Sequence, residues 1–244
     1  MQEHPQTRLR SVAPDIRPRS ECWYTQNDCR WRGPPRFGDR YESDDLHDMQ
    51  RDQTHVRKLR VRPLTFDLWP ALEDLFGKNG ACNGCWCMYW RIGTAYYKRP
   101  RAENREAFQQ VVKQGPPPGL LAFDGDLAVG WCQLTPRDAL PWLDRTRVLK
   151  RVDDIPVWSI SCFYVRRGYR RQGVTATLID AALKAARRAK APALEAYPGE
   201  MDRPKQVPLY TGTTSMFTRA GFKVVARGAP HRPIMRYDLK SGRR

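Results

Sequence analysis

The sequence predicts a domain of the α/β (α+β) class, in which strands and helices share one core. Its clearest unit is an apolar strand at residues 157–165, an arginine-rich turn and an alanine-rich helix at residues 174–188. Upstream, two apolar segments at residues 120–123 and 127–134 flank Asp124-Gly125, a dipeptide that is typical of a β-hairpin turn. This hairpin and the strand-turn-helix unit give one chain both kinds of secondary structure.

The ordered part of the chain is expected to begin near Lys58, with a strand at residues 59–64. Thr65 is a suitable N-cap for a helix at residues 66–76, which Gly77 then ends. A second helix is expected at residues 101–114, because a glycine and three prolines follow it.

After the hairpin, residues 137–150 form a polar, partly helical connection to the apolar strand. Beyond the alanine-rich helix, a short strand is expected at residues 193–197, where Pro198-Gly199 stops it. A short helix and two strands complete the domain, and these lie at residues 213–220, 223–227 and 234–239.

Length and composition exclude several classes of protein. The chain has 244 residues with 41% hydrophobic residues, so it holds enough apolar material for one sizeable domain with an extension. No apolar run approaches the roughly 18 residues that span a bilayer, and the N-terminus lacks a signal-peptide core. We therefore expect a cytoplasmic protein without a membrane partner, whose seven cysteines are reduced thiols.

The net charge of +17 is divided unevenly between two regions. Residues 1–56 sum to −1 and show no sustained periodicity, so we interpret them as a poorly ordered extension. Residues 57–244 carry the remaining +18, and such a field attracts phosphate-bearing ligands. Nucleic-acid binding is an alternative, but the basic residues are scattered, so that a nucleic-acid partner is not expected.

The turn between residues 165 and 175 carries the clearest chemical signal. Gly173 lies at the start of the alanine-rich helix, where backbone N–H groups have no partner within the helix and the helix dipole favours negative charge. A glycine there lets a pyrophosphate approach the backbone closely. The dinucleotide and Walker A glycine patterns are both absent from this turn.

The segment Arg170-Arg171-Gln172-Gly173-Val174-Thr175 resembles the acetyl-CoA signature of the GNAT (GCN5-related N-acetyltransferase) superfamily, Arg/Gln-x-x-Gly-x-Gly/Ala. Thr175 departs from the usual Gly or Ala. A second marker is Phe217-Thr218-Arg219-Ala220-Gly221-Phe222, which is similar to the superfamily's Tyr-x-x-x-Gly-Phe element. The resemblance extends from Lys58 to Leu239 and implies a GNAT fold, a mixed and mostly antiparallel central sheet flanked by helices, for a domain at residues 57–244 of a bacterial acetyltransferase-like protein.

What the resemblance implies is an acyl-CoA-dependent acyltransferase, in particular an N-acetyltransferase. An amine of a small molecule or a peptide would attack acetyl-CoA, the cosubstrate, directly. The cofactor would be held by the signature residues, by main-chain groups of the preceding strand and by the helix that carries Phe217: Cys162, Phe163, Tyr164, Val165, Arg170, Arg171, Gln172, Gly173, Val174, Thr175 and Phe217. A backbone N–H near Cys162 or Phe163 would meet the oxyanion.

Proton transfer is harder to assign, because Phe217 stands where the family usually has a tyrosine acid. Glu195 is our candidate base, with an ion pair to a neighbouring arginine as the alternative interpretation. Tyr210 is our candidate acid, and its alternative is a buried structural hydroxyl. A non-catalytic acyl-CoA sensor is therefore the alternative to an enzyme.

A cysteine- and tryptophan-rich segment, residues 81–91, follows the first predicted helix. In the family this segment lines the acceptor pocket, so we expect acceptor contacts from it: Cys85, Trp86, Cys87, Tyr89, Trp90 and Arg91. Zinc binding by Cys82, Cys85 and Cys87 is an alternative, but no nearby residue offers a fourth ligand, so we expect no metal. Simple packing is the second alternative, because Trp86, Met88 and Trp90 alternate as in a strand.

Overall fold

The computed structural model describes residues 58–200 and 209–239, and the expected fold class is confirmed. A seven-stranded sheet has the order β1-β2-β3-β4-β5-β7-β6, and only the β4–β5 pair is parallel. The strands are β1 (Arg60–Pro63), β2 (Gly119–Asp124), β3 (Leu127–Pro136), β4 (Trp158–Val165), β5 (Ala193–Ala196), β6 (Lys223–Ala229) and β7 (Arg232–Asp238).

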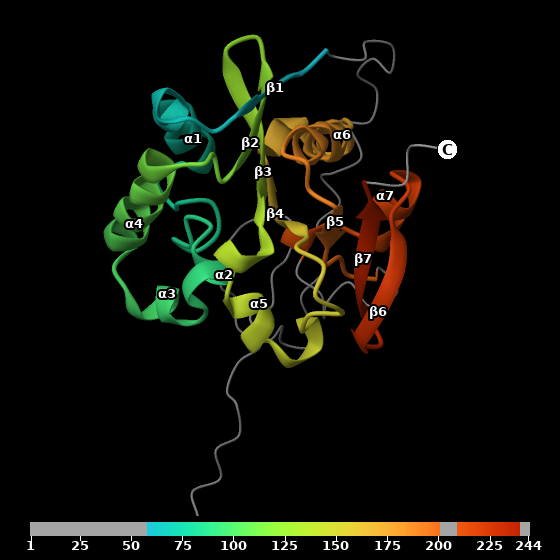
Figure 1. Cartoon of the computed structure of the whole chain (residues 1–244). Coiled ribbons are helices and arrows are strands. Elements are labelled where there is room, and N and C mark those ends of the chain that lie inside the picture. The colour runs from blue at the N-terminus through green and yellow to red at the C-terminus, as the bar shows by residue number, and fades with distance from the viewer. Residues whose placement is uncertain (1–57, 201–208, 240–244) are drawn as a thin grey trace, which may run out of the picture.

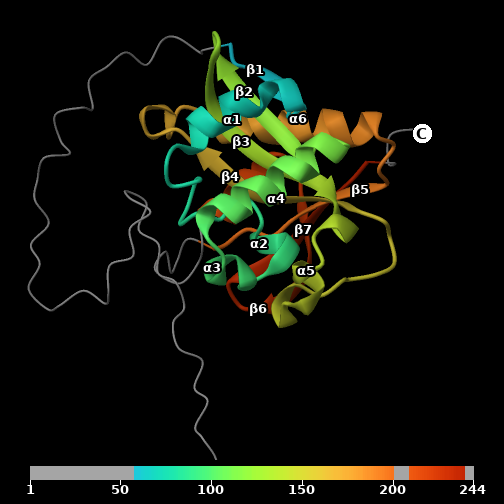
Figure 2. The same cartoon turned by 90° about the vertical axis from the view of Figure 1, so that its left-hand side faces the viewer.

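Helices cover both faces of the sheet, as Figures 1 and 2 show. In the described residues they are α1 (Trp69–Phe76), α2 (Tyr89–Ile92), α3 (Ala95–Lys98), α4 (Arg101–Gln114), α5 (Trp142–Arg145), α6 (Val174–Arg188) and α7 (Thr214–Arg219). Helices α1 and α4 lie on one side of the sheet and α6 lies on the other (Figure 1). Helices α2 and α5 lie together near the end of the sheet where β4 begins.

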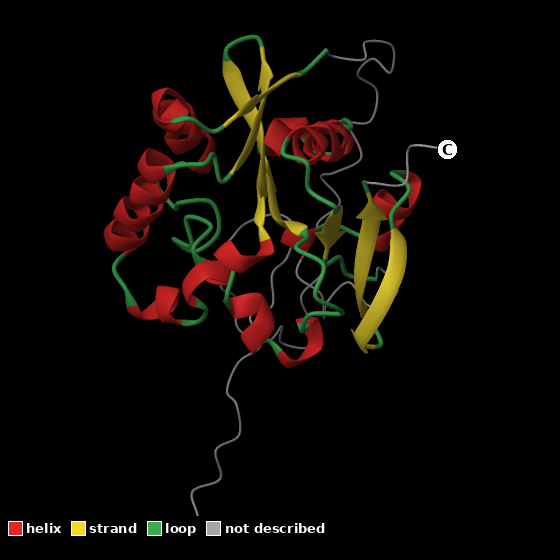
Figure 3. Ribbon diagram, viewed as in Figure 1, coloured by secondary structure: helices red, strands yellow, loops and turns green. Residues whose placement is uncertain are grey.

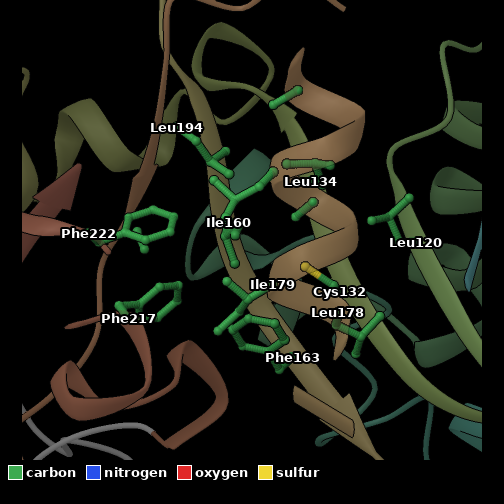
Figure 4. Close-up of a cluster of buried hydrophobic side chains, with 14 of the residues drawn as sticks. Leu120, Cys132, Leu134, Ile160, Phe163, Leu178, Ile179, Leu194, Phe217 and Phe222 are labelled. Atoms are coloured by element: carbon green, nitrogen blue, oxygen red, sulfur yellow. The ribbon is translucent and has the colours of Figure 1, made fainter. Parts of the chain in front are cut away.

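Each face of the sheet has its own apolar core. Helix α6 buries Leu178 and Ile179 against Ile160 and Phe163 of β4, and Phe217 and Phe222 complete this cluster (Figure 4). On the other face, α1 and α4 pack with Trp131 of β3. No residue of β4 is exposed, as expected for a strand whose sheet is covered on both faces.

Strand β4 lies in the middle of the sheet, whose strands are yellow in Figure 3, and it has two irregularities. Its pairing with β3 shifts between Gln133 and Leu134, so Ser161 is left out of the register as a bulge. Its pairing with β5 covers only Trp158 to Ile160, and β4 then continues to Val165 without a partner strand on that side among the described residues. The two parallel strands therefore separate just where β4 bulges.

The structure differs from the sequence prediction in the segment after α1. The expected strand-like alternation of Trp86, Met88 and Trp90 is wrong, because residues 77–88 form turns and α2 begins at Tyr89. Helices α2 and α3 have four residues each, too few for a periodic pattern. The extension predicted at residues 1–56 lies outside the described residues, as does part of the loop predicted before Pro208.

Candidate functional site

The turn between β4 and α6 presents an exposed helix N-terminus. Gly173 is the N-cap residue of α6, with a left-handed φ of 80°, and Arg171 has a φ of 62°. A Cβ added at Gly173 meets no atom within 4 Å, so the space beside the backbone is open. The first N–H groups of α6 point out of the helix, because the helix has no acceptors for them. The turn thus offers backbone donors to an anion.

Side chains fix the shape of this turn through bonds to its own backbone. Gln172 Nε2 donates to the Gly168 carbonyl at 2.9 Å, and Arg170 Nε donates to the Val165 carbonyl at 3.3 Å. Val174, which follows Gly173, is buried in the α6 core. Arg171 and Gln172 are exposed and Val174 is buried, and the binding of a cofactor by these residues stays a prediction.

The end of β4 that has no β5 partner lies directly before this turn. Phe163 faces the α6 core, whereas Cys162 and Tyr164 pack against the core on the α1 side. Since the pairing of β4 with β5 ends at Ile160, the β4 edge that faces away from β3 has no neighbouring strand from Cys162 to Val165 among the described residues. The structure brings this edge and the Gly173 turn together at the end of one strand.

Phe217 is fully buried and belongs to the core. Its ring lies 5.1 Å from that of Phe222 and 6.1 Å from that of Phe163. The ring therefore packs against β4 beyond the point where its pairing with β5 ends. A phenylalanine supplies no proton there.

Glu195 lies on β5 inside a buried ionic network. Its Oε1 accepts hydrogen bonds from Arg236 at 2.7 and 3.1 Å, and its Oε2 accepts from Arg137 at 3.3 Å and from the Tyr197 hydroxyl at 3.1 Å. The residue is 1% exposed. Glu195 thus has the arginine partners of the alternative interpretation, and its role as a base stays a prediction.

Two further carboxylates complete this network. Asp144 accepts from Arg137 at 2.6 Å, and Asp153 accepts from Arg236 at 2.6 Å. The hydrogen bond from Arg236 lowers the pKa of Asp153. Burial raises the pKa of Tyr197, whose hydroxyl also contacts Ser159 at 2.7 Å. The network holds together β5, β7 and the segment between β3 and β4.

Tyr210 lies in the short 3-10 helix η6 (Leu209–Thr211), which contacts β4. The tyrosine packs against a third apolar cluster, which includes Trp90 and Tyr197, and Tyr89 packs against the same cluster. Trp90 is buried, and its Nε1 donates to the Ser161 carbonyl at 3.0 Å, which ties α2 to the β4 bulge. Tyr89, Trp90 and Tyr210 are thus brought to one side of β4.

The cysteine-rich segment divides into a buried and a half-buried part. Trp86 and Cys87 are 6% and 3% exposed, and the Trp86 ring stacks on Trp69 at 5.8 Å. Cys85, Tyr89 and Arg91 are half-buried. The packing alternative describes Trp86 and Cys87 as the structure places them, and their contact with an acceptor stays a prediction.

The fold brings a distant thiol to this segment. Cys162 of β4 lies with its sulfur 3.9 Å from that of Cys87, and Trp131 Nε1 donates to Cys87 Sγ at 3.0 Å. The hydrogen bond with Cys87, together with burial, raises the pKa of Cys162. Among the described residues, no group of three or more His, Cys, Asp or Glu side chains is arranged to hold a metal ion.

The sequence matches the model of the acetyltransferase (GNAT) family over residues 84–211. This match covers just over half of the chain and includes both the cysteine-rich segment and the Gly173 turn. The protein belongs to the GNAT family of acetyltransferases, whose cosubstrate is acetyl-CoA. No protein of curated function matches the sequence.

Solved structures of acetyltransferases resemble the chain at low sequence identity. The PaiA N-acetyltransferase from Thermoplasma acidophilum in complex with coenzyme A is 16% identical, with a TM-score of 0.44 over 74% of this chain and 98% of that chain. YncA from Salmonella typhimurium with acetyl-CoA is 13% identical, with a TM-score of 0.46 over 75% and 95%. An N-acetyltransferase from Staphylococcus aureus Mu50 is 13% identical, with a TM-score of 0.45 over 75% and 99%. The family assignment rests on the sequence match.

The residues of the turn fit such a cosubstrate, since open space and backbone donors meet at Gly173. Sequence reasoning missed the partners of Glu195. Arg236 is its direct neighbour across β5 and β7, and Arg137 reaches it from the end of β3. A pairing of opposite charges between strands becomes visible only when the register is known. In the described residues, no helix is both long and apolar enough to cross a membrane.

Proposed function

We propose that the protein moves an acetyl group from acetyl-CoA to an amine by direct attack, as a GNAT-type N-acetyltransferase. The observation that carries this proposal is the exposed Gly173 turn, which follows the half of β4 that has no β5 partner. A cytoplasmic location and a small-molecule or peptide acceptor are part of the proposal.

The chain's own groups serve three tasks. Backbone N–H groups from Arg171 to Thr175 bind the pyrophosphate, because they point into open space at the positive end of α6. The free edge of β4 from Cys162 to Val165 binds the pantetheine arm in the manner of an added strand. A backbone N–H at Cys162 or Phe163 stabilises the oxyanion. Acetyl-CoA supplies the activated acetyl group as a thioester.

Phe217 takes no part in the two proton transfers, one to the leaving thiolate and one from the attacking amine. Tyr210 is the proposed acid for the leaving thiolate, since η6 contacts β4 and the tyrosine carries a hydroxyl that Phe217 lacks. Water is a sufficient proton acceptor for amines of low basicity. Replacing Tyr210 by Phe separates this role from packing, because it keeps the ring.

Calorimetric titration of the full chain with CoA tests the binding site. Gly173→Asp is expected to abolish binding, since the side chain fills the space above the N–H groups and adds negative charge. Gly77→Asp is the matched control, because Gly77 also has a left-handed φ, 61°, and open space around it. Normal CoA affinity in Gly173→Asp, or no CoA binding by the wild type, contradicts the proposed site.

A non-catalytic acyl-CoA sensor is the second candidate function, favoured by the buried Phe217 in place of a tyrosine acid. Release of free thiol from acetyl-CoA across a broad panel of amines separates the two. Turnover with any amine supports the enzyme, and tight CoA binding without turnover supports the sensor.

A further inference from the structure

The two arginines of β7 differ in burial and in their partners, since Arg236 is buried and Arg232 is half-buried. Arg236 contacts Glu195 and Asp153 at 2.7 and 2.6 Å. Arg232 is the first residue of the same strand. Its guanidinium donates to the Thr211 hydroxyl at 3.4 Å. Among the described residues, no Asp or Glu oxygen lies within 4 Å of the Arg232 guanidinium. Arg232 therefore carries a charge that the described protein groups leave without a counterion.

The surroundings of Arg232 make such a charge unfavourable in the absence of a ligand. Burial lowers the pKa of Arg232, and the nearby phenol groups of Tyr210 and Tyr89 oppose this effect. A partly desolvated guanidinium gains most from an anion that offers two parallel acceptors, as a carboxylate does. Among the described residues, the bond from Nη1 to Thr211 is the one side-chain hydrogen bond of Arg232, so its Nε and Nη2 can donate to such an anion.

Arg91, which follows Trp90 in the sequence, is a second arginine without a carboxylate partner among the described residues. Its Nη1 donates to the Ala139 carbonyl at 3.1 Å, whereas its Nε is buried without a hydrogen-bond partner among the described residues. Burial lowers the pKa of Arg91 as well. Arg91 and Arg232 are thus two half-buried arginines that have no carboxylate partner among the described residues.

Arg232 is linked through Thr211 to the part of β4 that has no β5 partner. Its partner Thr211 belongs to η6, which contacts β4. The next residue, Gly212, lies against Phe163, since a Cβ added there would be 3.4 Å from that ring. Trp90, the neighbour of Tyr89, binds the β4 bulge at Ser161. A ligand group held by Arg232 therefore lies close to the strand edge that precedes the Gly173 turn.

We propose that Arg232 binds the carboxylate of the acceptor, so that the acceptor is an amine that also carries a carboxylate group, as an amino acid or a peptide with a nearby carboxylate does. This inference rests on the proposed acetyl transfer, and it names the class of acceptor. Tyr89 and Tyr210 pack against one apolar cluster, and their phenol groups raise the pKa of the same guanidinium.

The test compares matched acceptors by thiol release from acetyl-CoA with the full chain. Each amino acid is paired with its carboxamide, which has the same shape without the negative charge, at equal concentrations of the neutral amine. We expect kcat/KM for the preferred amino acid to exceed that of its carboxamide by about 10- to 100-fold, the range for a hydrogen bond to a charged group. Peptides with a free or an amidated carboxylate in a second panel distinguish a peptide from a free amino acid.

Variants assign the preference to one side chain. Arg232→Gln is expected to reduce the ratio of amino acid to carboxamide to near 1, and Arg232→Lys is expected to restore part of it, because lysine keeps the charge without the fork. Arg147→Gln removes one exposed positive charge and is expected to keep the wild-type ratio. Circular dichroism confirms that each variant is folded.

The outcomes separate this inference from the proposed function. Equal use of acids and amides by the wild type, or an unchanged ratio in Arg232→Gln, overturns the carboxylate site while acetyl transfer stands. If no amine releases thiol, the proposed function fails, and thermal stabilisation by amino acids in the presence of CoA then tests Arg232 directly. Stabilisation that is equal in wild type and Arg232→Gln also overturns the site.

Discussion

Glu195 shows how one carboxylate can be read in two ways from a sequence. A glutamate on the strand beside the cofactor strand is well placed for a base, yet in the structure Arg137 and Arg236 occupy its two oxygens. Removing the charge of one member of a buried network leaves the remaining charges under-compensated. The side chain at this position therefore affects stability first, because both arginines depend on it.

Glu195→Gln is expected to lower the free energy of unfolding by about 3 kcal/mol, since each arginine keeps one other carboxylate, Asp144 or Asp153. Urea unfolding measures this loss. Turnover of the folded variant separates the two roles of Glu195, because a structural carboxylate leaves turnover within about threefold of wild type, whereas loss of a general base costs about 100-fold or more. Glu73→Gln, which removes a half-buried partner of Arg105, is expected to cost less than about 1 kcal/mol and serves as the control.

At the scale of elements, the sequence predicted every strand of the sheet and four of the helices, α1, α4, α6 and α7. Strong periodicity and clear end signals made this possible, as at Gly115 after α4 and Gly173 before α6. The segment after α1 could not be predicted in this way. Seven of its residues have left-handed φ values, and four of these are not glycine: Ala81, Asn83, Trp86 and Cys87. Such conformations depend on tertiary packing rather than on local preference.

Trp86 illustrates the packing that holds this segment. Its ring lies between Trp69 and Phe76, at 5.8 and 5.6 Å from their rings, and a Cβ at Gly80 would collide with it. The site was only partly predictable for a related reason. The Gly173 turn is local in sequence, whereas Tyr89 and Tyr210 reach one apolar cluster from distant segments and Arg232 binds Thr211 of η6.

Trp86→Ala is expected to destabilise the protein by about 3–5 kcal/mol, the usual cost of removing a buried tryptophan. Thermal and urea unfolding measure the effect, and CoA affinity of the folded variant is expected to stay near that of wild type. Tyr97→Ala, an exposed aromatic residue in the same region, is the control and is expected to change stability little. A stable Trp86→Ala variant with impaired acceptor use would instead identify Trp86 as a pocket residue.

At the scale of the molecule, charge and chain organisation act together. The net charge of the chain is +17. Residues 57–244 contribute +18 to it and residues 1–56 contribute −1. The described elements, from β1 to β7, form one sheet with a core on each face. The positive field that attracts the phosphates of CoA therefore belongs to the same region as the Gly173 turn.

A chain that begins at residue 57 is therefore expected to fold and to bind CoA with an affinity within about threefold of the full chain, since the removed residues contribute only −1 to the charge. Calorimetry with CoA at low and at high salt measures both parts of this expectation. The dissociation constant is expected to rise with salt equally in the two chains, because the screened charges lie in the retained region. Loss of folding, or a change in the salt dependence on truncation, would show that residues 1–56 are part of the acetyltransferase domain.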